Sequence, residues 1–148
     1  MKFIVYLSGE VHTDWREEII EGAEKENLPI EFLKPVMTHS ASDNVGVDVL
    51  GSEEKSFWKD HKAAKINSMR IKTAIKRSDV VVVKFGEQYR QWNAAFEAGY
   101  AVGKSKSLIV IHPEDFTHAL KEVDGSAQAV AQTSEQVVEL LKYISTQK

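Results

Sequence analysis

Four consecutive valines constrain the fold of this chain more than any other feature. They occupy Val80–Val83, directly after Asp79. A strand with one solvated face alternates apolar and polar residues, whereas an unbroken run of β-branched residues indicates a strand buried on both faces. Such strands are typical of parallel sheets that helices cover on both sides. We therefore predict a central strand at 79–83 in an α/β fold.

Segments with strand-like and helix-like patterns alternate on both sides of this run. Short apolar segments predict further strands at 2–7, 30–33, 107–111 and 127–131. Helical spacing of apolar residues predicts helices at 15–27, 58–77, 92–102, 115–123 and 134–143. Asp14 is a candidate cap of the first helix, and Thr133-Ser134-Glu135-Gln136 reads as a capping box before the last.

This alternation predicts a doubly wound, flavodoxin-like sheet of about five mostly parallel strands with helices on both faces. The 148 residues suit one domain, so we expect residues 1–148 to form a single domain. Ligands of such folds bind beyond the carboxyl ends of the strands. The loops at 8–13, 34–57 and 86–91 therefore matter most. The segment 34–57, rich in Ser, Asp, Asn and Gly, is expected to be a long functional loop.

The composition excludes several classes of function. Lys and Arg number 19 against 22 Asp and Glu, a net charge of −3, so the basic excess of a nucleic-acid-binding protein is missing. Cysteine is absent, which excludes a disulfide framework and a thiolate zinc site. The five histidines lack the spacing of a metal-binding helix, so we expect no metal. We expect no cofactor, because the glycine-rich signatures of dinucleotide and nucleoside-triphosphate sites are missing.

The apolar segments are also too short for a membrane segment. None approaches the roughly 18 residues that cross a bilayer. The apolar run at 3–7 is too short for the core of a signal peptide. We therefore expect a cytoplasmic protein with no membrane partner.

Glu97 is the most unusual titratable residue of the chain. It lies alone in the segment 94–101, which otherwise contains only Ala, Phe, Gly and Tyr. Asn93 lies four residues earlier, on the same face of the predicted helix. A carboxylate among apolar groups costs free energy unless something compensates it, so Glu97 is either an exposed helix residue or a functional acid. The spacing of Phe96 and Tyr100 favours packing for both rings.

These motifs resemble those of the nucleoside 2-deoxyribosyltransferase superfamily and, over nearly the whole length, those of the YtoQ family within it. The superfamily features are Tyr-Leu-Ser-Gly at 6–9, the Asp79 strand, Glu-x-Gly-x-Ala at 97–101 and Gly-Lys at 103–104. The stretches that match the YtoQ family lie at 6–12, 15–18, 60–67, 85–87 and 91–95.

The resemblance implies a specific chemistry. Glu97 matches the nucleophile that attacks the anomeric carbon of deoxyribose, and Tyr6 matches the tyrosine that hydrogen-bonds it. The ligand would be a small nucleoside or nucleotide-like molecule. The candidate substrate-binding residues are Gly9, Glu10, His12, Asp60, Asn67, Arg70, Gly86, Trp92 and Asn93. A homo-oligomer is also implied, because sites of the superfamily are often completed by a neighbouring subunit. The aromatic side chains of Trp58, Tyr89 and Trp92 are expected to be exposed, as interface residues often are.

Two positions differ from the superfamily and leave two functions open. Ile71 occupies the place of an aspartate that transferases carry in the helix before the central strand. Residues 91–93 are Gln-Trp-Asn, where transferases have an Asp-x-Gly-Thr-like turn. The Tyr6–Glu97 pairing favours an enzyme that transfers or hydrolyses at an N-glycosidic bond. The two differences favour a non-catalytic pocket that binds a nucleotide-like ligand as a sensor or partner module.

Overall fold

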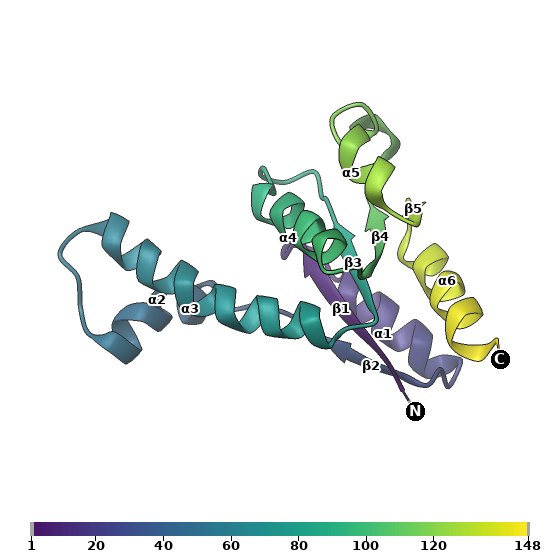
Figure 1. Ribbon diagram of the computed structural model, residues 1–148, viewed down its shortest axis with the longest axis horizontal. Coiled ribbons are helices and arrows are strands. Elements are labelled where there is room, and N and C mark those ends of the chain that lie inside the picture. The colour runs from purple at the N-terminus through teal and green to yellow at the C-terminus, as the bar shows by residue number, and fades with distance from the viewer. Residues whose placement is uncertain (1, 148) are drawn as a thin grey trace. The chain divides into compact units, whose positions relative to one another are not determined.

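The valine run lies in a five-stranded parallel sheet, as predicted, and this sheet forms the centre of one compact unit of the chain (Figure 1). The computed structural model describes residues 2–147. The chain folds into two compact units, one made of the residues up to Lys34 and from Ile75 onward, the other of Pro35–Ala74. The strands are β1 (Phe3–Gly9), β2 (Ile30–Leu33), β3 (Val80–Lys84), β4 (Ser107–Ile111) and β5 (Ala129–Ala131). The helices are α1 (Trp15–Lys25), α2 (His39–Leu50), α3 (Ser56–Arg77), α4 (Trp92–Gly103), the 3-10 turn η1 (Glu114–Phe116), α5 (Lys121–Ser126) and α6 (Ser134–Thr146).

The strand order confirms the predicted fold class. The strands lie in the order β2-β1-β3-β4-β5, and every neighbouring pair is parallel. The strand β2 lies on one side of β1, and β3, β4 and β5 follow on the other side. The strand order therefore reverses between β1 and β3. In doubly wound sheets this point opens the ligand crevice at the carboxyl ends of the strands.

Asp79 fixes the start of the central strand against β1. Its carboxylate accepts a hydrogen bond from the Ile4 N–H at 2.8 Å, and its own N–H donates to the Ile4 carbonyl at 2.8 Å. From there the register runs to Ser8 opposite Val83 and Gly9 opposite Lys84. The acid before the valine run thus aligns the two strands that flank the switch point.

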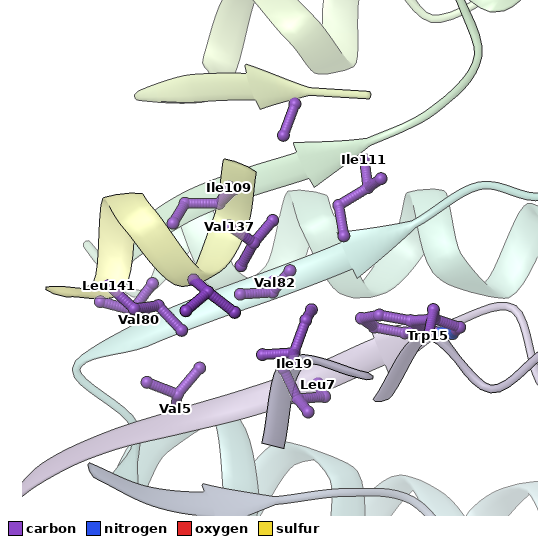
Figure 2. Close-up of a cluster of buried hydrophobic side chains, with 12 residues drawn as sticks. Val5, Leu7, Trp15, Ile19, Val80, Val82, Ile109, Ile111, Val137 and Leu141 are labelled. Atoms are coloured by element: carbon purple, nitrogen blue, oxygen red, sulfur yellow. The ribbon is translucent and has the colours of Figure 1, made fainter. Parts of the chain in front are cut away.

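The apolar core lies on the face of the sheet that α1 and α6 cover (Figure 2). Alternate strand residues point into it (Figure 2), and the two helices that cover it pack on each other. Its buried members are Val5, Leu7, Trp15, Ile19, Val80, Val82, Ile109, Ile111, Ala131, Val137, Val138 and Leu141. The predicted capping box begins α6, since Gln136 N–H donates to Thr133 Oγ1 and Gln136 Oε1 accepts from Thr133 N–H.

The opposite face of the sheet carries α4, which packs against β1, β3 and β4. Ala94, Ala98 and Ala101 are its buried residues, and their small side chains allow the helix to approach the strands closely. Because side chains alternate along a strand, Tyr6 and Ser8 point to this face while Val5 and Leu7 point into the apolar core. Both Tyr6 and Ser8 are fully buried.

The second unit corrects the prediction of a loop at 34–57. Residues His39–Leu50 form the helix α2. Its Ser, Asp, Asn and Gly residues have weak helix propensity, so tertiary packing decides the structure of this segment. A Cβ on Gly46 would lie 2.5 Å from Lys62 Cβ, so α2 and α3 meet at this glycine. Asn67 Nδ2 donates to the Ser42 carbonyl at 3.0 Å and joins the same two helices.

Two smaller expectations also change. The helix predicted at 115–123 is the 3-10 turn η1 followed by α5, which begins at Lys121. Asp14 occupies the N-cap position of α1, but its side chain makes no capping hydrogen bond.

Candidate active site

Glu97 points from α4 toward the carboxyl end of β1. It lies three residues after Ala94 and four before Ala101, so helical spacing places it beside the stripe that faces the sheet. Its side chain is half-buried. Ser8 Oγ donates a hydrogen bond to Glu97 Oε2 across 89 residues of sequence. The first structural partner of the candidate nucleophile is therefore Ser8.

Burial and two neighbours act on the ionisation of Glu97 in opposite directions. Burial raises the pKa of its carboxyl, because the charged form loses solvation. The hydrogen bond from Ser8 and the positive charge of Arg16 both lower this pKa and favour the carboxylate. Burial thus destabilises the carboxylate, while a hydrogen bond and a nearby positive charge stabilise it. Functional acids often have such environments.

Arg16 reaches the same region from α1 and is fully buried. Burial lowers the pKa of its guanidinium, while the nearby Tyr6, Glu10, Glu17 and Glu97 raise it. Its described hydrogen bonds go to backbone carbonyls at the end of β1. A buried cation therefore lies beside the carboxyl edge of the sheet.

Gly9 allows β1 to turn at this edge. Its φ is +107°, a conformation that residues with a Cβ rarely adopt, and an added Cβ would clash with the Lys84 carbonyl oxygen. The next residue continues this close approach, since the Glu10 N–H donates to the Lys84 carbonyl at 2.9 Å. The predicted residue Gly9 therefore has a structural role that brings the β1 loop against β3.

A cavity of about 340 Å³ opens beyond the carboxyl ends of β1, β3 and β4. It lies where the fold class predicts the ligand crevice. Glu10, His12 and Gly86, three of the predicted substrate-binding residues, line it. The other lining residues are Thr13, Lys84, Phe85, Glu87, Gln88, Ile111, His112, Pro113 and Gln132.

Glu10 is buried at the base of its loop, with only 2% of its surface exposed. Its carboxylate accepts hydrogen bonds from the His12 N–H and, at 2.6 Å, from Thr13 Oγ1. The His12 ring lies 4.8 Å from the ring of Tyr89, centroid to centroid. The loops after β1 and β3 therefore meet through aromatic side chains near the cavity.

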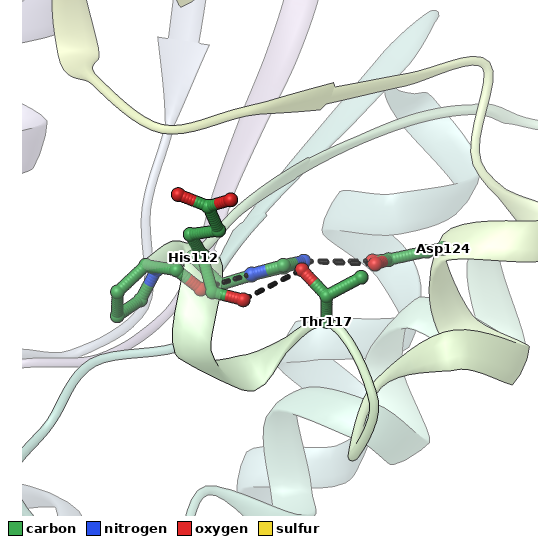
Figure 3. Close-up of polar contacts among 5 residues, drawn as sticks. His112, Thr117 and Asp124 are labelled. Atoms are coloured by element: carbon green, nitrogen blue, oxygen red, sulfur yellow. Dashed lines mark hydrogen bonds and ion pairs between the residues drawn. The ribbon is translucent and has the colours of Figure 1, made fainter.

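His112 lines the cavity beside β4 and takes part in a polar network (Figure 3). Its Nε2 lies 2.9 Å from Asp124 Oδ2, and its Nδ1 lies 2.7 Å from the Pro113 carbonyl oxygen. Thr117 Oγ1 donates to the Glu114 carbonyl at 2.7 Å within the same turn. These bonds attach the end of β4 to η1 and α5.

The start of α4 presents aromatic side chains to solvent. Trp92 is 72% exposed and Phe96 is 62% exposed. The exposure of Trp58, Tyr89 and Trp92 agrees with expectation, but the predicted packing of Phe96 is wrong, because the buried face of α4 consists of alanines. Asn93 is also exposed. Neither Trp92 nor Asn93 lies on the stripe that faces the sheet.

The remaining predicted residues, Asp60, Asn67 and Arg70, lie on α3 in the second unit. Asn67 has a structural role there through its hydrogen bonds to Ser42, and the part of all three in substrate binding stays a prediction. Within residues 2–147 no cluster of three or more His, Asp or Glu side chains is suited to a metal ion. No helix in this range has the length and apolarity needed to span a membrane.

Solved structures share this doubly wound fold. A 2-deoxyribosyltransferase from Bacillus psychrosaccharolyticus aligns over 91% of this chain and 90% of its own, with a TM-score of 0.54 and 16% identity. A CMP N-glycosidase from Clostridium botulinum aligns over 95% of this chain and 98% of its own, with a TM-score of 0.55 and 14% identity. At such low identities these likenesses establish the fold.

The sequence itself establishes the family. Residues 6–145 match the family described as Nucleoside 2-deoxyribosyltransferase YtoQ. The protein described as uncharacterized protein YtoQ of Bacillus subtilis (strain 168) is 43% identical over 144 residues, which cover 97% of each chain. The chain therefore belongs to the nucleoside 2-deoxyribosyltransferase YtoQ family, as its motifs predict.

Sequence reasoning missed two residues of this site, Ser8 and Arg16. Ser8 falls in the predicted loop at 8–13, although strand alternation puts it on the same face as Tyr6. Arg16 lies three and seven residues before Ile19 and Ala23, so it falls within the apolar stripe of α1. A charged residue within an apolar stripe is unusual, and this position could have identified Arg16 as a buried cation. The hydrogen bond expected between Tyr6 and Glu97 stays a prediction.

Proposed function

We propose that this protein cleaves or transfers at the N-glycosidic bond of a nucleoside or nucleotide-like substrate, with Glu97 as the nucleophile. The observation that carries the proposal is the Glu97 carboxylate, half-buried on α4 at the carboxyl end of β1 with Ser8 as its donor. Membership of the family supports the same chemistry. The activities named for the two fold neighbours, deoxyribosyl transfer and CMP N-glycoside cleavage, also act at N-glycosidic bonds.

The proposed reaction proceeds in two displacements. A Glu97 carboxylate oxygen bonds to the anomeric carbon as the N-glycosidic bond breaks, and the electron pair of that bond leaves with the base, which takes up a proton. A second base or a water then attacks the glycosyl ester, loses a proton, and returns Glu97 as a carboxylate. Ser8 holds the attacking carboxylate, and we assign Tyr6 a supporting contact to it.

Glu10, His12 and Gly86 line the cavity beyond the strand ends, whereas Glu97 is not among its lining residues. The substrate would therefore extend from this cavity toward Glu97. A base could stack on the exposed Trp92, since aromatic faces bind any nucleobase. We expect a homo-oligomer, because exposed aromatic side chains such as Trp58 and Tyr89 are typical of interfaces.

Base exchange tests this function. The protein is incubated with a panel of deoxynucleosides, ribonucleosides and their monophosphates, with and without free bases, and products are separated by chromatography. We expect new nucleosides or free base from the wild type, and a loss of several orders of magnitude in Glu97→Gln. Glu139→Gln, on the exposed side of α6, should keep full activity. Near-wild-type turnover in Glu97→Gln would contradict the proposal, and saturable nucleoside binding without turnover would favour a ligand-binding module.

A further inference from the structure

Arg16 is a charged side chain with no exposed surface, on a helix whose other inward residues belong to the apolar core. Its Nε donates to the Leu7 carbonyl at 3.0 Å and its Nη2 to the Gly9 carbonyl at 3.1 Å. Its Nη1 donates to the Glu10 carbonyl at 2.5 Å. These acceptors are uncharged, so they bind three of the five guanidinium N–H groups without cancelling the positive charge.

The hydrogen bonds of Arg16 enclose the residue that binds Glu97. Leu7 and Gly9 are the neighbours of Ser8 along β1, and Arg16 holds the carbonyls of both. The Ser8 hydroxyl in turn donates to Glu97. Moving the guanidinium would therefore move the donor that orients the carboxylate.

We propose that Arg16 is a positioning residue for Glu97: its guanidinium fixes the backbone on both sides of Ser8, whose hydroxyl binds the Glu97 carboxylate. The inference rests on the proposed function, since it assigns Arg16 to the support of that nucleophile. The charge of Arg16 lowers the pKa of the Glu97 carboxyl and so opposes the effect of burial.

The geometry explains why an arginine is used. A planar fork with separate N–H donors can bind several fixed carbonyl oxygens at once, whereas an ammonium is a compact point charge. The ionisable groups that face Arg16 are Tyr6, Glu10, Glu17 and Glu97. A test must therefore separate the effect of Glu97 from that of the other acids.

Titration of the folded wild type by NMR makes this separation. The protein carries carbon-13 in its glutamate carboxyls and nitrogen-15 in its arginines, and the two signals are assigned by their loss in Glu97→Gln and Arg16→Lys. We expect the Arg16 Nε–H signal to shift with the same midpoint as the Glu97 carboxyl, and this shift to vanish in Glu97→Gln. Arg77, which lies 3.5 Å from Glu31 on the surface, is the control and should not follow Glu97. An Arg16 signal that ignores the ionisation of Glu97 would overturn the inference.

Arg16→Gln and Arg16→Lys extend the test to the reaction. Removing the charge in Arg16→Gln should move the Glu97 titration and the acidic limb of the activity profile to higher pH. Arg16→Lys keeps the charge, so it should lower turnover with a smaller shift of that limb. If turnover falls by the same factor at every pH and the Glu97 titration midpoint is unchanged, Arg16 has only a structural role. The wild type could catalyse no exchange while its Arg16 Nε–H signal still shifts with the Glu97 midpoint. That result would contradict the proposed function but support the interaction between Arg16 and Glu97. The wild-type titration decides the matter even where Arg16→Gln does not fold.

Discussion

Replacing Ser8 with alanine should destabilise the protein by an amount that depends on pH. The Ser8 hydroxyl is buried and donates to Glu97, so the substitution removes one hydrogen bond and little volume. A hydrogen bond to a charged group contributes about 1.5–3 kcal/mol, against about 0.5–1.5 kcal/mol for a bond between neutral groups. Ser8→Ala should therefore cost about 1 kcal/mol more where Glu97 is ionised than where it is protonated.

Urea unfolding measures this difference. The unfolding midpoints of wild type and Ser8→Ala are compared at one pH below and one pH above the measured titration of Glu97, whose pKa is raised by burial. The same comparison in a Glu97→Gln background is the control, because glutamine does not ionise. There the cost of Ser8→Ala should be equal at both pH values. Equal costs in the wild-type background, or a pH dependence that persists in the Glu97→Gln background, would refute the coupling.

Three other substitutions probe the same site. Glu97→Gln should raise the melting temperature relative to wild type, and the difference should grow with pH. The raised pKa of Glu97 means that its contribution to stability is present below the ordinary value of 4.5 and is lost as pH rises through the folded value. Gly9→Ala should lower the free energy of unfolding by at least about 1–3 kcal/mol in urea titrations, because φ is +107° and the new Cβ would meet the Lys84 carbonyl. Trp92→Ala should leave the melting temperature nearly unchanged, since the ring is 72% exposed, and should weaken nucleoside binding by about 1–3 kcal/mol in calorimetry.

Each of these has a control. Glu139→Gln removes the same charge from an exposed position of α6 and is the matched variant for Glu97→Gln. A melting-temperature difference for Glu97→Gln that shrinks with pH would reverse the sign argued here. A Cβ on Gly125 would meet no atom within 4 Å, so Gly125→Ala should be tolerated. If both glycine substitutions lower the free energy of unfolding equally, the clash at Gly9 is not the cause. Phe96→Ala tests whether any effect of Trp92→Ala merely reflects a lost aromatic surface.

Local sequence patterns predicted the parts of the fold that local chemistry decides. Val80–Val83 predicted a strand buried on both faces, because a strand with one solvated face would alternate apolar and polar residues. Thr133 and Gln136 predicted a helix start because the two side chains satisfy each other's backbone. Asp79 begins the predicted strand at 79–83, and its carboxylate binds the Ile4 N–H of the neighbouring strand. The fold class follows from the order of such elements.

Contacts between distant segments lay beyond those patterns. The helix α2 depends on packing against α3 at Gly46, which its own weak helix formers do not indicate. The partnership of Ser8 with Glu97 depends on the rotation of α4 over β1, which no local motif specifies. Glu97 itself was identifiable as a lone acid among apolar residues, whereas its donor was identifiable only in three dimensions.

Covalent trapping tests the role of Glu97 most directly. A 2-fluoro-substituted deoxynucleoside should let the first displacement occur and slow the release of the glycosyl ester. We predict that intact-mass spectrometry will show one fluorosugar adduct on the wild type, that peptide mapping will place it on Glu97, and that Glu97→Gln will show none. An adduct on another residue, or turnover of the natural nucleoside by Glu97→Gln, would contradict the account.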